Sequence, residues 1–225
     1  MQQEPATPAI RLHSYWRSSA AYRVRIALAL KGLEFDLSTW KMIDGEHRSE
    51  AYRALAPFGL VPMLEIDGLR LQQSMAIIDY LEERFPARQR LLPETLPEKA
   101  RARAVAQLIA CEVHPLNNLR VLHELRSRFG AGDAQVRGWY RHWCEEGLGA
   151  AEAALAQGPG QAAQAFAFGD RPGLVECFLI PQLYNARRFG VDTAAYPRLS
   201  ALDAACEALP AFVAARPESQ PDAPA

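Results

Sequence analysis

The sequence has few cysteines, no long apolar run and almost no net charge. Its four cysteines are widely separated and form no Cys-x-x-Cys pair, so we expect reduced core thiols and neither a disulfide framework nor a metal site. No uninterrupted apolar stretch reaches the roughly 18 residues that a membrane-spanning helix needs. The chain carries 25 lysines and arginines against 26 acidic residues, and this balance argues against nucleic acid as a partner.

The amino terminus also lacks the basic start and the apolar segment of a secretory signal, so we expect a cytoplasmic protein without a membrane partner. The chain has 225 residues, of which 49% are hydrophobic and 23% are charged. This length and composition allow one large core or two smaller ones.

The first part of the sequence has the pattern of an α/β unit. Residues 10–14 alternate like a strand, and residues 20–31 have helical periodicity that ends at Gly32, where a left-handed cap is expected. An extended stretch over residues 33–38 and a short helical segment over residues 46–55 follow. The predicted order is therefore strand, helix, strand, helix.

The pattern then changes to an antiparallel hairpin and a helix. Asp67 and Gly68 lie between two short apolar runs, which is a strong signal for a tight turn. Ser74 is the predicted N-cap of a helix over residues 75–84. Residues 86–97 contain prolines and charges between periodic segments, and we interpret them as a linker.

The rest of the chain has a helical pattern. Apolar residues recur at helical spacing in four segments, residues 100–126, 134–156, 174–189 and 198–214. We therefore predict an α/β domain over residues 8–90, an all-helical domain over residues 96–216 and a flexible tail over residues 217–225.

A serine pair, Ser18 and Ser19, comes directly before the first predicted helix. Hydroxyl and backbone N–H groups at a helix start lie where partial positive charge collects, which favours a bound anion such as a thiolate. Arg17 adds a cation beside them. On spacing alone, the better interpretation is that the serines cap the helix and that Arg17 is a surface charge.

The segment SSAAYRVRIAL, residues 18–28, resembles the signature of the zeta class of glutathione transferases, in which Ser-Ser-Cys is followed two residues later by Arg-Val-Arg-Ile-Ala-Leu. Similar segments follow in order: LAPFGLVPML (55–64), QSMAIIDYLEE (73–83), HPLNNLRVL (114–122) and IPQLYNARRF (180–189). The resemblance covers about residues 10–222. It implies a thioredoxin-like α/β amino-terminal domain, an all-α carboxy-terminal domain, a homodimer and glutathione as the cofactor.

The resemblance also implies glutathione contacts in the first domain. Val61 would precede a cis proline, and its backbone would pair with the tripeptide. Gln73 and Ser74 would hold the γ-glutamyl carboxylate at a helix start, and His47 would hold the glycyl end. A plain strand-start proline, an N-cap and a solvated loop histidine are the alternative interpretations.

The second domain contributes further candidates. Pro115 is expected to kink the first long helix, and the resemblance places His114, Asn118 and Arg120 near the active site or the partner subunit as glutathione contacts. A lone helical histidine is more often structural. Arg17 and Arg188 are the candidates for binding substrate carboxylates, because the guanidinium fork pairs with a carboxylate. Arg188 is almost equally well explained by its favourable position at a helix carboxy terminus.

Zeta-class proteins that resemble this chain are maleylacetoacetate isomerases of tyrosine and phenylalanine catabolism. The resemblance therefore implies a glutathione-dependent cis–trans isomerase of a small unsaturated diacid, with Ser18, Ser19 and Arg17 as catalytic residues. Alternatives among enzymes are a maleylpyruvate isomerase and a transferase or dehalogenase acting on small α-halo acids. A non-catalytic glutathione-binding module is an alternative of a different class.

Two positions depart from the family pattern. Ala20 stands where the family has a cysteine, and this absence motivates the non-catalytic alternative. Gly173 stands where the family usually has serine or threonine three residues before an aspartate. Glu176 is expected to complete half of a capping box there, and the glycine to cost about 1 kcal/mol or less.

Overall fold

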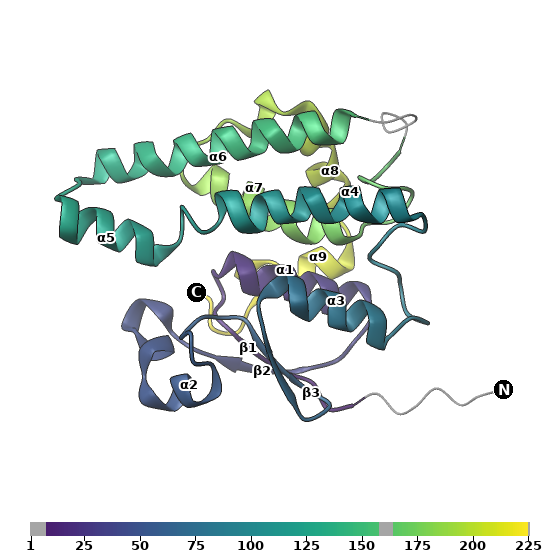
Figure 1. Ribbon diagram of the computed structural model, residues 1–225, viewed down its shortest axis with the longest axis horizontal. Coiled ribbons are helices and arrows are strands. Elements are labelled where there is room, and N and C mark those ends of the chain that lie inside the picture. The colour runs from purple at the N-terminus through teal and green to yellow at the C-terminus, as the bar shows by residue number, and fades with distance from the viewer. Residues whose placement is uncertain (1–7, 158–163, 225) are drawn as a thin grey trace. The chain divides into compact units, whose positions relative to one another are not determined.

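The computed structural model describes residues 8–157 and 164–224 and divides into two compact units (Figure 1). Unit 1 runs to Arg90 and resumes at Pro210, and unit 2 spans Leu91–Leu209. Within the described ranges, no helix is both long enough and apolar enough to cross a membrane.

Unit 1 is built on a four-stranded mixed sheet. The strands are β1 (Arg11–Ser14), β2 (Asp36–Thr39), β3 (Met63–Ile66) and β4 (Leu69–Gln72), in the spatial order β2-β1-β3-β4. β1 is parallel to β2, as a helical crossover requires, and antiparallel to β3. The predicted β3–β4 hairpin is confirmed, since Asp67 and Gly68 at its turn both have positive φ, 50° and 75°.

The helices of unit 1 are α1 (Ser19–Leu30), α2 (Glu50–Leu55), α3 (Ser74–Arg84) and α9 (Pro210–Ala215). α1 and α3 lie together on one face of the sheet, and α9 packs against α1 (Figure 1). Gly32 follows α1 with φ of 61°, the left-handed conformation predicted for it. Strands, hairpin and helices together give the expected thioredoxin-like arrangement.

Two short 3-10 turns, Met42–Asp44 and Glu46–Arg48, connect β2 to α2. Ser49 caps α2 by accepting a hydrogen bond from the N–H of Tyr52 at 3.2 Å. The helical segment predicted over residues 46–55 is thus one 3-10 turn followed by one short α-helix.

The carboxy-terminal segment differs from its prediction. Pro210 begins a separate helix, so the single helix expected over residues 198–214 is divided into α8 (Pro197–Glu207) and α9. The chain from Pro210 onward belongs to unit 1, whereas the sequence pattern assigned residues 210–216 to the helical domain.

The expected flexible tail is also corrected. Pro217–Ser219 forms a 3-10 turn, and Pro217 and Gln220 are buried. The side-chain amide of Gln220 donates to the C=O groups of Ala214 and Arg216 at 2.9 and 3.0 Å. The burial of Pro217 and the hydrogen bonds of Gln220 therefore hold this segment in place.

Unit 2 is helical. Its elements are α4 (Leu96–Gln107), a π-helical segment (Leu108–Val113), α5 (Leu119–Phe129), α6 (Asp133–Ala156), α7 (Leu174–Arg188), a 3-10 turn (Thr193–Ala195) and α8. Twelve of the fifteen residues of α7 are buried, and α7 contacts α4 and α8. α7 is therefore the central helix of this unit, as an almost continuously apolar helix should be.

The helix expected over residues 100–126 is interrupted. After α4, the N–H of His114 bonds to the C=O of Ile109 at 3.0 Å, which is the spacing of a π-helix, and the break predicted at Pro115 follows. A Cβ atom at Gly147 of α6 would lie 2.0 Å from a methyl carbon of Val113. Glycine at this position therefore allows α6 to approach the π-helical segment.

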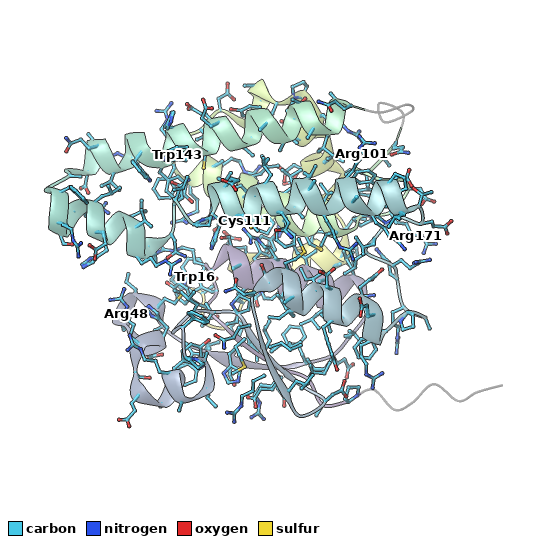
Figure 2. The ribbon with its side chains drawn as sticks, in the orientation of Figure 1. Trp16, Arg48, Arg101, Cys111, Trp143 and Arg171 are labelled. Atoms are coloured by element: carbon cyan, nitrogen blue, oxygen red, sulfur yellow. The ribbon has the colours of Figure 1, made fainter. Side chains whose placement is uncertain are left out.

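The cysteine prediction holds for three of four residues. Cys144, Cys177 and Cys206 are buried, and burial raises the pKa of the Cys144 thiol to about 12. Cys111, labelled in Figure 2, is exposed and not a core thiol. It lies in the π-helical segment, whose altered turn shifts the helical phase on which the prediction relied.

Candidate active site

The amino terminus of α1 has the geometry of an anion-binding site. Ser18 is the N-cap, and its Oγ accepts a hydrogen bond from the N–H of Ala21 at 3.2 Å. The first turn contains no acidic residue. Among the described residues, no hydrogen bond engages the backbone N–H of Ala20. The positive end of the helix dipole is therefore not neutralised by the helix's own side chains.

The two serines differ in exposure. Ser18 is half-buried, whereas Ser19 is only 7% exposed. A hydroxyl that accepts one hydrogen bond still has its own O–H to donate, so Ser18 can cap the helix and hold an anion at the same time. Ser18 is therefore the better candidate for contact with a thiolate.

Arg17 lies next to the serine pair and is half-buried. Its guanidinium lies over the ring of Trp16, 5.6 Å from the centroid. Stacking on an indole keeps an arginine extended and leaves its N–H edges able to pair with a carboxylate.

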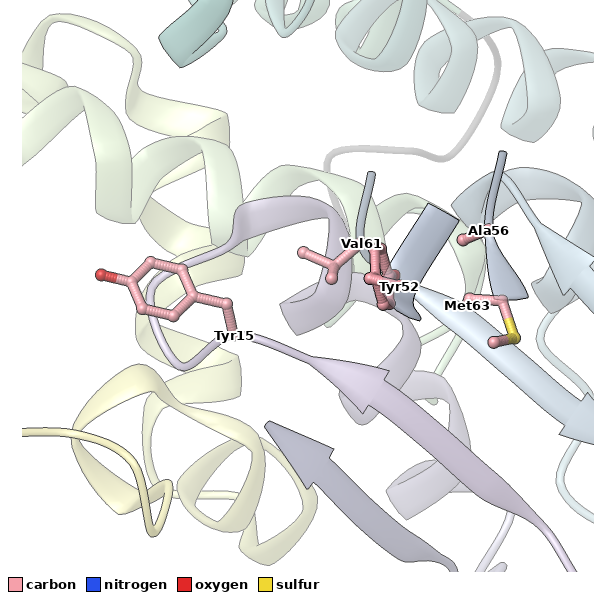
Figure 3. Packing of buried hydrophobic residues seen from close by; sticks show 5 residues of the cluster. All are labelled: Tyr15, Tyr52, Ala56, Val61 and Met63. Carbon is pink, nitrogen blue, oxygen red and sulfur yellow. The ribbon is translucent and has the colours of Figure 1, made fainter. Parts of the chain in front are cut away.

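Val61 belongs to a buried cluster with Tyr15, Tyr52, Ala56 and Met63 (Figure 3). The peptide between Val61 and Pro62 is cis, as predicted. Within residues 8–157 and 164–224, neither the N–H nor the C=O of Val61 takes part in a backbone hydrogen bond. Both groups can therefore pair with an extended peptide.

The start of α3 corrects one prediction. Gln73, not Ser74, occupies the N-cap position, and its φ of 72° is in a region that few non-glycine residues adopt. Ser74 is the first helical residue, and its Oγ accepts a hydrogen bond from Nη1 of the buried Arg23 at 3.3 Å. A buried guanidinium beside a helix amino terminus favours a carboxylate at this place.

His47 lies in the 3-10 turn before α2 and is 8% exposed, so it is not the solvated loop residue of the alternative interpretation. Burial lowers its pKa, and Arg48 and Arg53 lower it further. Among the described residues, Nδ1 of His47 is buried without a hydrogen-bond partner. A buried ring nitrogen in this state is suited to a polar ligand atom.

These elements of unit 1 lie together. Trp16 packs against the cluster that contains Val61. The C=O of His47 would lie 2.8 Å from a Cβ atom at Gly59, two residues before Val61. Arg23 joins α1 to Ser74. The predicted residues of the first domain therefore come from adjoining elements.

Four predicted residues belong to unit 2, where several have structural roles. Asn118 caps α5 by accepting from the N–H of Arg120 at 3.2 Å, and His114 bonds through its backbone in the π-helical segment. Arg120 is exposed. Arg188 is exposed at the end of α7, near the rings of Tyr184 and Phe189.

Comparisons with known proteins agree with this geometry. The sequence models of the glutathione S-transferase N-terminal and C-terminal domains match residues 17–84 and 144–202. The maleylacetoacetate isomerase of Pseudomonas aeruginosa is 48% identical over 219 residues, which cover 96% of this chain and 100% of that protein. A solved maleyl pyruvate isomerase, described as a bacterial zeta-class glutathione S-transferase, has a TM-score of 0.91 at 42% identity over 95% of this chain and 100% of its own.

This chain belongs to the zeta class of glutathione transferases. A further relative, the maleylacetoacetate isomerase of Anaeromyxobacter dehalogenans, was solved with glutathione in its active site. It is 44% identical with a TM-score of 0.86, over 97% of this chain and 99% of that one.

Some residues that shape the site of this zeta-class transferase were not predicted. Arg23 and Arg25 are almost fully buried in α1, and Asp222 contacts the loop before that helix. Two arginines inside an otherwise apolar helical run are a signal that sequence reading could have used, because buried arginines need defined partners. No local pattern identifies Asp222.

Proposed function

We propose that this chain is a glutathione-dependent cis–trans isomerase that converts maleylacetoacetate to fumarylacetoacetate. The observation that carries the proposal is the start of α1, where the Ser18 hydroxyl caps a helix whose first turn has no acid and Arg17 is the preceding residue. These groups favour a thiolate over a thiol, and so lower the pKa of a bound thiol.

The other groups of unit 1 fit the tripeptide. The backbone of Val61 is suited to the cysteinyl residue, Gln73 and Ser74 to the γ-glutamyl carboxylate, and the buried Nδ1 of His47 to the glycyl end. When bound, glutathione supplies a thiolate that adds reversibly to the substrate double bond and so permits rotation about it. Ser18 and Ser19 would stabilise the thiolate, and Arg17 and Arg188 would hold the carboxylates of the diacid.

Further glutathione contacts from unit 2, through His114, Asn118 and Arg120, are part of the same proposal. We also propose a cytoplasmic homodimer that acts in the catabolism of aromatic amino acids, as the identity with maleylacetoacetate isomerases supports. The attacking sulfur belongs to glutathione, so Ala20 in place of the family cysteine does not remove the nucleophile.

Maleylpyruvate is the second candidate substrate, favoured by the TM-score of 0.91 with a maleyl pyruvate isomerase. Both substrates are cis-unsaturated diacids that two arginines can hold in the same way. Conjugation to α-halo acids would need the same thiolate but no return of the thiol.

The test is conversion of maleylacetoacetate and of maleylpyruvate, followed spectroscopically with and without glutathione. Ser18→Ala should lower kcat/KM about 100-fold, because it removes a donor to the thiolate. The matched control is Thr95→Ala, since Thr95 caps α4 in the same way, through its Oγ1, outside the proposed site. Each variant loses an N-cap worth about 1 kcal/mol, so their stabilities should change alike while only Ser18→Ala loses activity. Glutathione binding without turnover of either diacid would contradict the proposal.

A further inference from the structure

Arg25 is a buried arginine whose side chain bonds to the loop before α1, to the end of β1 and to α9. It is 1% exposed, and burial lowers its pKa to about 10. Its guanidinium donates to the Oγ of Ser14 at 3.1 Å and to the C=O groups of Tyr15 and Trp16 at 3.4 and 2.9 Å. Its Nε donates to the C=O of Ala215, in α9, at 2.9 Å. One side chain therefore holds the last residue of β1 and the first two residues of the loop, and joins them to α9.

Asp222 holds the same loop from the opposite end of the chain. Its Oδ2 accepts a hydrogen bond from the backbone N–H of Trp16 at 2.9 Å. Both polar backbone groups of Trp16 are thus bound by charged side chains, the C=O by Arg25 and the N–H by Asp222. The two charges also attract each other. Hydrogen bonds to charged groups are the stronger ones in proteins, so this arrangement restricts the loop.

The restricted loop carries the catalytic candidates. The N–H of Ser18 donates to the C=O of Tyr15 at 2.9 Å, which closes the turn into α1. The ring of Trp16, labelled in Figure 2, lies beneath the guanidinium of Arg17. A displacement of the Trp16 backbone would therefore move both Arg17 and the Ser18 hydroxyl.

We propose that Arg25 and Asp222 form a clamp that fixes the Trp16 backbone and thereby positions Arg17 and Ser18 for the bound thiolate and the substrate. This inference rests on the proposed function for its catalytic consequence. The carboxy-terminal segment is then part of the active-site architecture, and Asp222 is a positioning residue.

Asp222 is the residue to change, because replacing the buried Arg25 would also perturb folding. The rest of the segment is held independently by the burial of Pro217 and by the bonds of Gln220. Asp222→Ala removes the acceptor, whereas Asp222→Asn removes the charge and keeps an oxygen that can accept from Trp16. Glu34→Ala, at an exposed acid of unit 1, is the control for loss of one negative charge.

Two measurements test the clamp. Amide hydrogen exchange of residues 15–18 in the ligand-free protein reports on the loop, and its rate should rise about tenfold in Asp222→Ala and little in Asp222→Asn or Glu34→Ala.

Ultraviolet titration of the thiol of bound glutathione reports on positioning. Removal of a negative charge alone would lower the thiol pKa, whereas loss of positioning should raise it in Asp222→Ala. The kcat/KM should fall about tenfold, with recovery in Asp222→Asn.

Unchanged exchange of residues 15–18 in Asp222→Ala would overturn the clamp. Faster exchange with an unchanged or lower thiol pKa would overturn its role in positioning. Absence of isomerase activity in the wild type would refute the proposed function alone, since exchange and titration do not depend on turnover. Failure of the wild type to bind glutathione would overturn both the proposed function and the catalytic role of the clamp.

Discussion

Two helices of this protein begin with opposite chemistry. At the start of α1, Ser18 caps the helix and the first turn has no acid. At the start of α7, Gly173 supplies no side chain, and the buried carboxyl of Glu176 accepts from the N–H groups of Gly173 and Ala167, each at 2.7 Å. α7 therefore satisfies its own amino terminus, whereas α1 leaves a positive end that an external anion can use.

The comparison separates a structural helix start from a functional one. In α7, the Glu176 carboxyl joins the helix to the segment around Ala167, inside unit 2. Burial raises the pKa of this carboxyl, and the two N–H donors oppose that rise. The first-turn carboxyl of α7 thus holds the fold, whereas the first turn of α1 has no acid and its amino terminus is available for a ligand.

The largest effect is expected from removing the first-turn carboxyl of α7. Glu176→Ala should lower the free energy of unfolding by about 3 kcal/mol, because the buried N–H of Ala167 and the half-buried N–H of Gly173 lose their acceptor. Urea unfolding followed by circular dichroism measures this change.

The matched control is Glu98→Ala. Glu98 has the same position in the first turn of α4 but is only half-buried, and it accepts from the Thr95 hydroxyl. Its loss should cost about 0.5 kcal/mol. Equal costs in the two variants would show that burial does not distinguish the two carboxyl groups.

The second prediction concerns Gly173, where the family usually has serine or threonine. A Cβ atom there would lie 2.5 Å from the C=O oxygen of Leu91, which accepts from the N–H of Leu174 at 2.7 Å. Gly173→Ser should therefore lower stability by about 2 kcal/mol, although a serine cap is normally favourable. The glycine permits the approach of residue 91 and is not merely a weak cap.

Gly132→Ser, at the N-cap of α6, provides the contrast. A Cβ atom at Gly132 would meet only the side-chain oxygen of Gln135 at 3.7 Å. This variant should gain a few tenths of a kcal/mol. The midpoints of thermal unfolding of both variants measure the difference, and a gain at Gly173 would show that Leu91 can move away.

Sequence patterns predicted the elements whose causes are local. The hairpin at Asp67 and Gly68 and the cap at Gly32 each depend on one or two backbone angles that few residues adopt. The start of α1 was predicted because a serine cap acts within one turn of its own helix. In each case the physical cause lies within a few residues.

Features that depend on distant contacts were missed or predicted wrongly. The expected flexible tail instead binds Trp16 through Asp222, across 206 positions of the sequence. The π-helical segment that interrupts the first long helix packs against Gly147, a position that no local pattern connects with it. The cost attributed to Gly173 omitted Leu91, which only the folded unit brings near. Tertiary contacts decided each of these outcomes.

The last and smallest effect comes from giving α1 a first-turn carboxyl, as α7 already has. Ala20 is partly exposed in the first turn of α1. Ala20→Glu should weaken glutathione binding about tenfold, or about 1.4 kcal/mol, because the new carboxylate competes with the thiolate for the helix dipole. The fold should keep its stability within about 0.5 kcal/mol, since an acid in the first turn is favourable there.

Ala20→Gln has nearly the same size without the charge, so the dissociation constants of the two variants for glutathione, measured by calorimetry, isolate the electrostatic part. The difference between the two dissociation constants should become smaller at high salt, because screening weakens interactions between exposed charges. Equal weakening in both variants at every salt concentration would show that shape, rather than the unneutralised amino terminus of α1, governs glutathione binding.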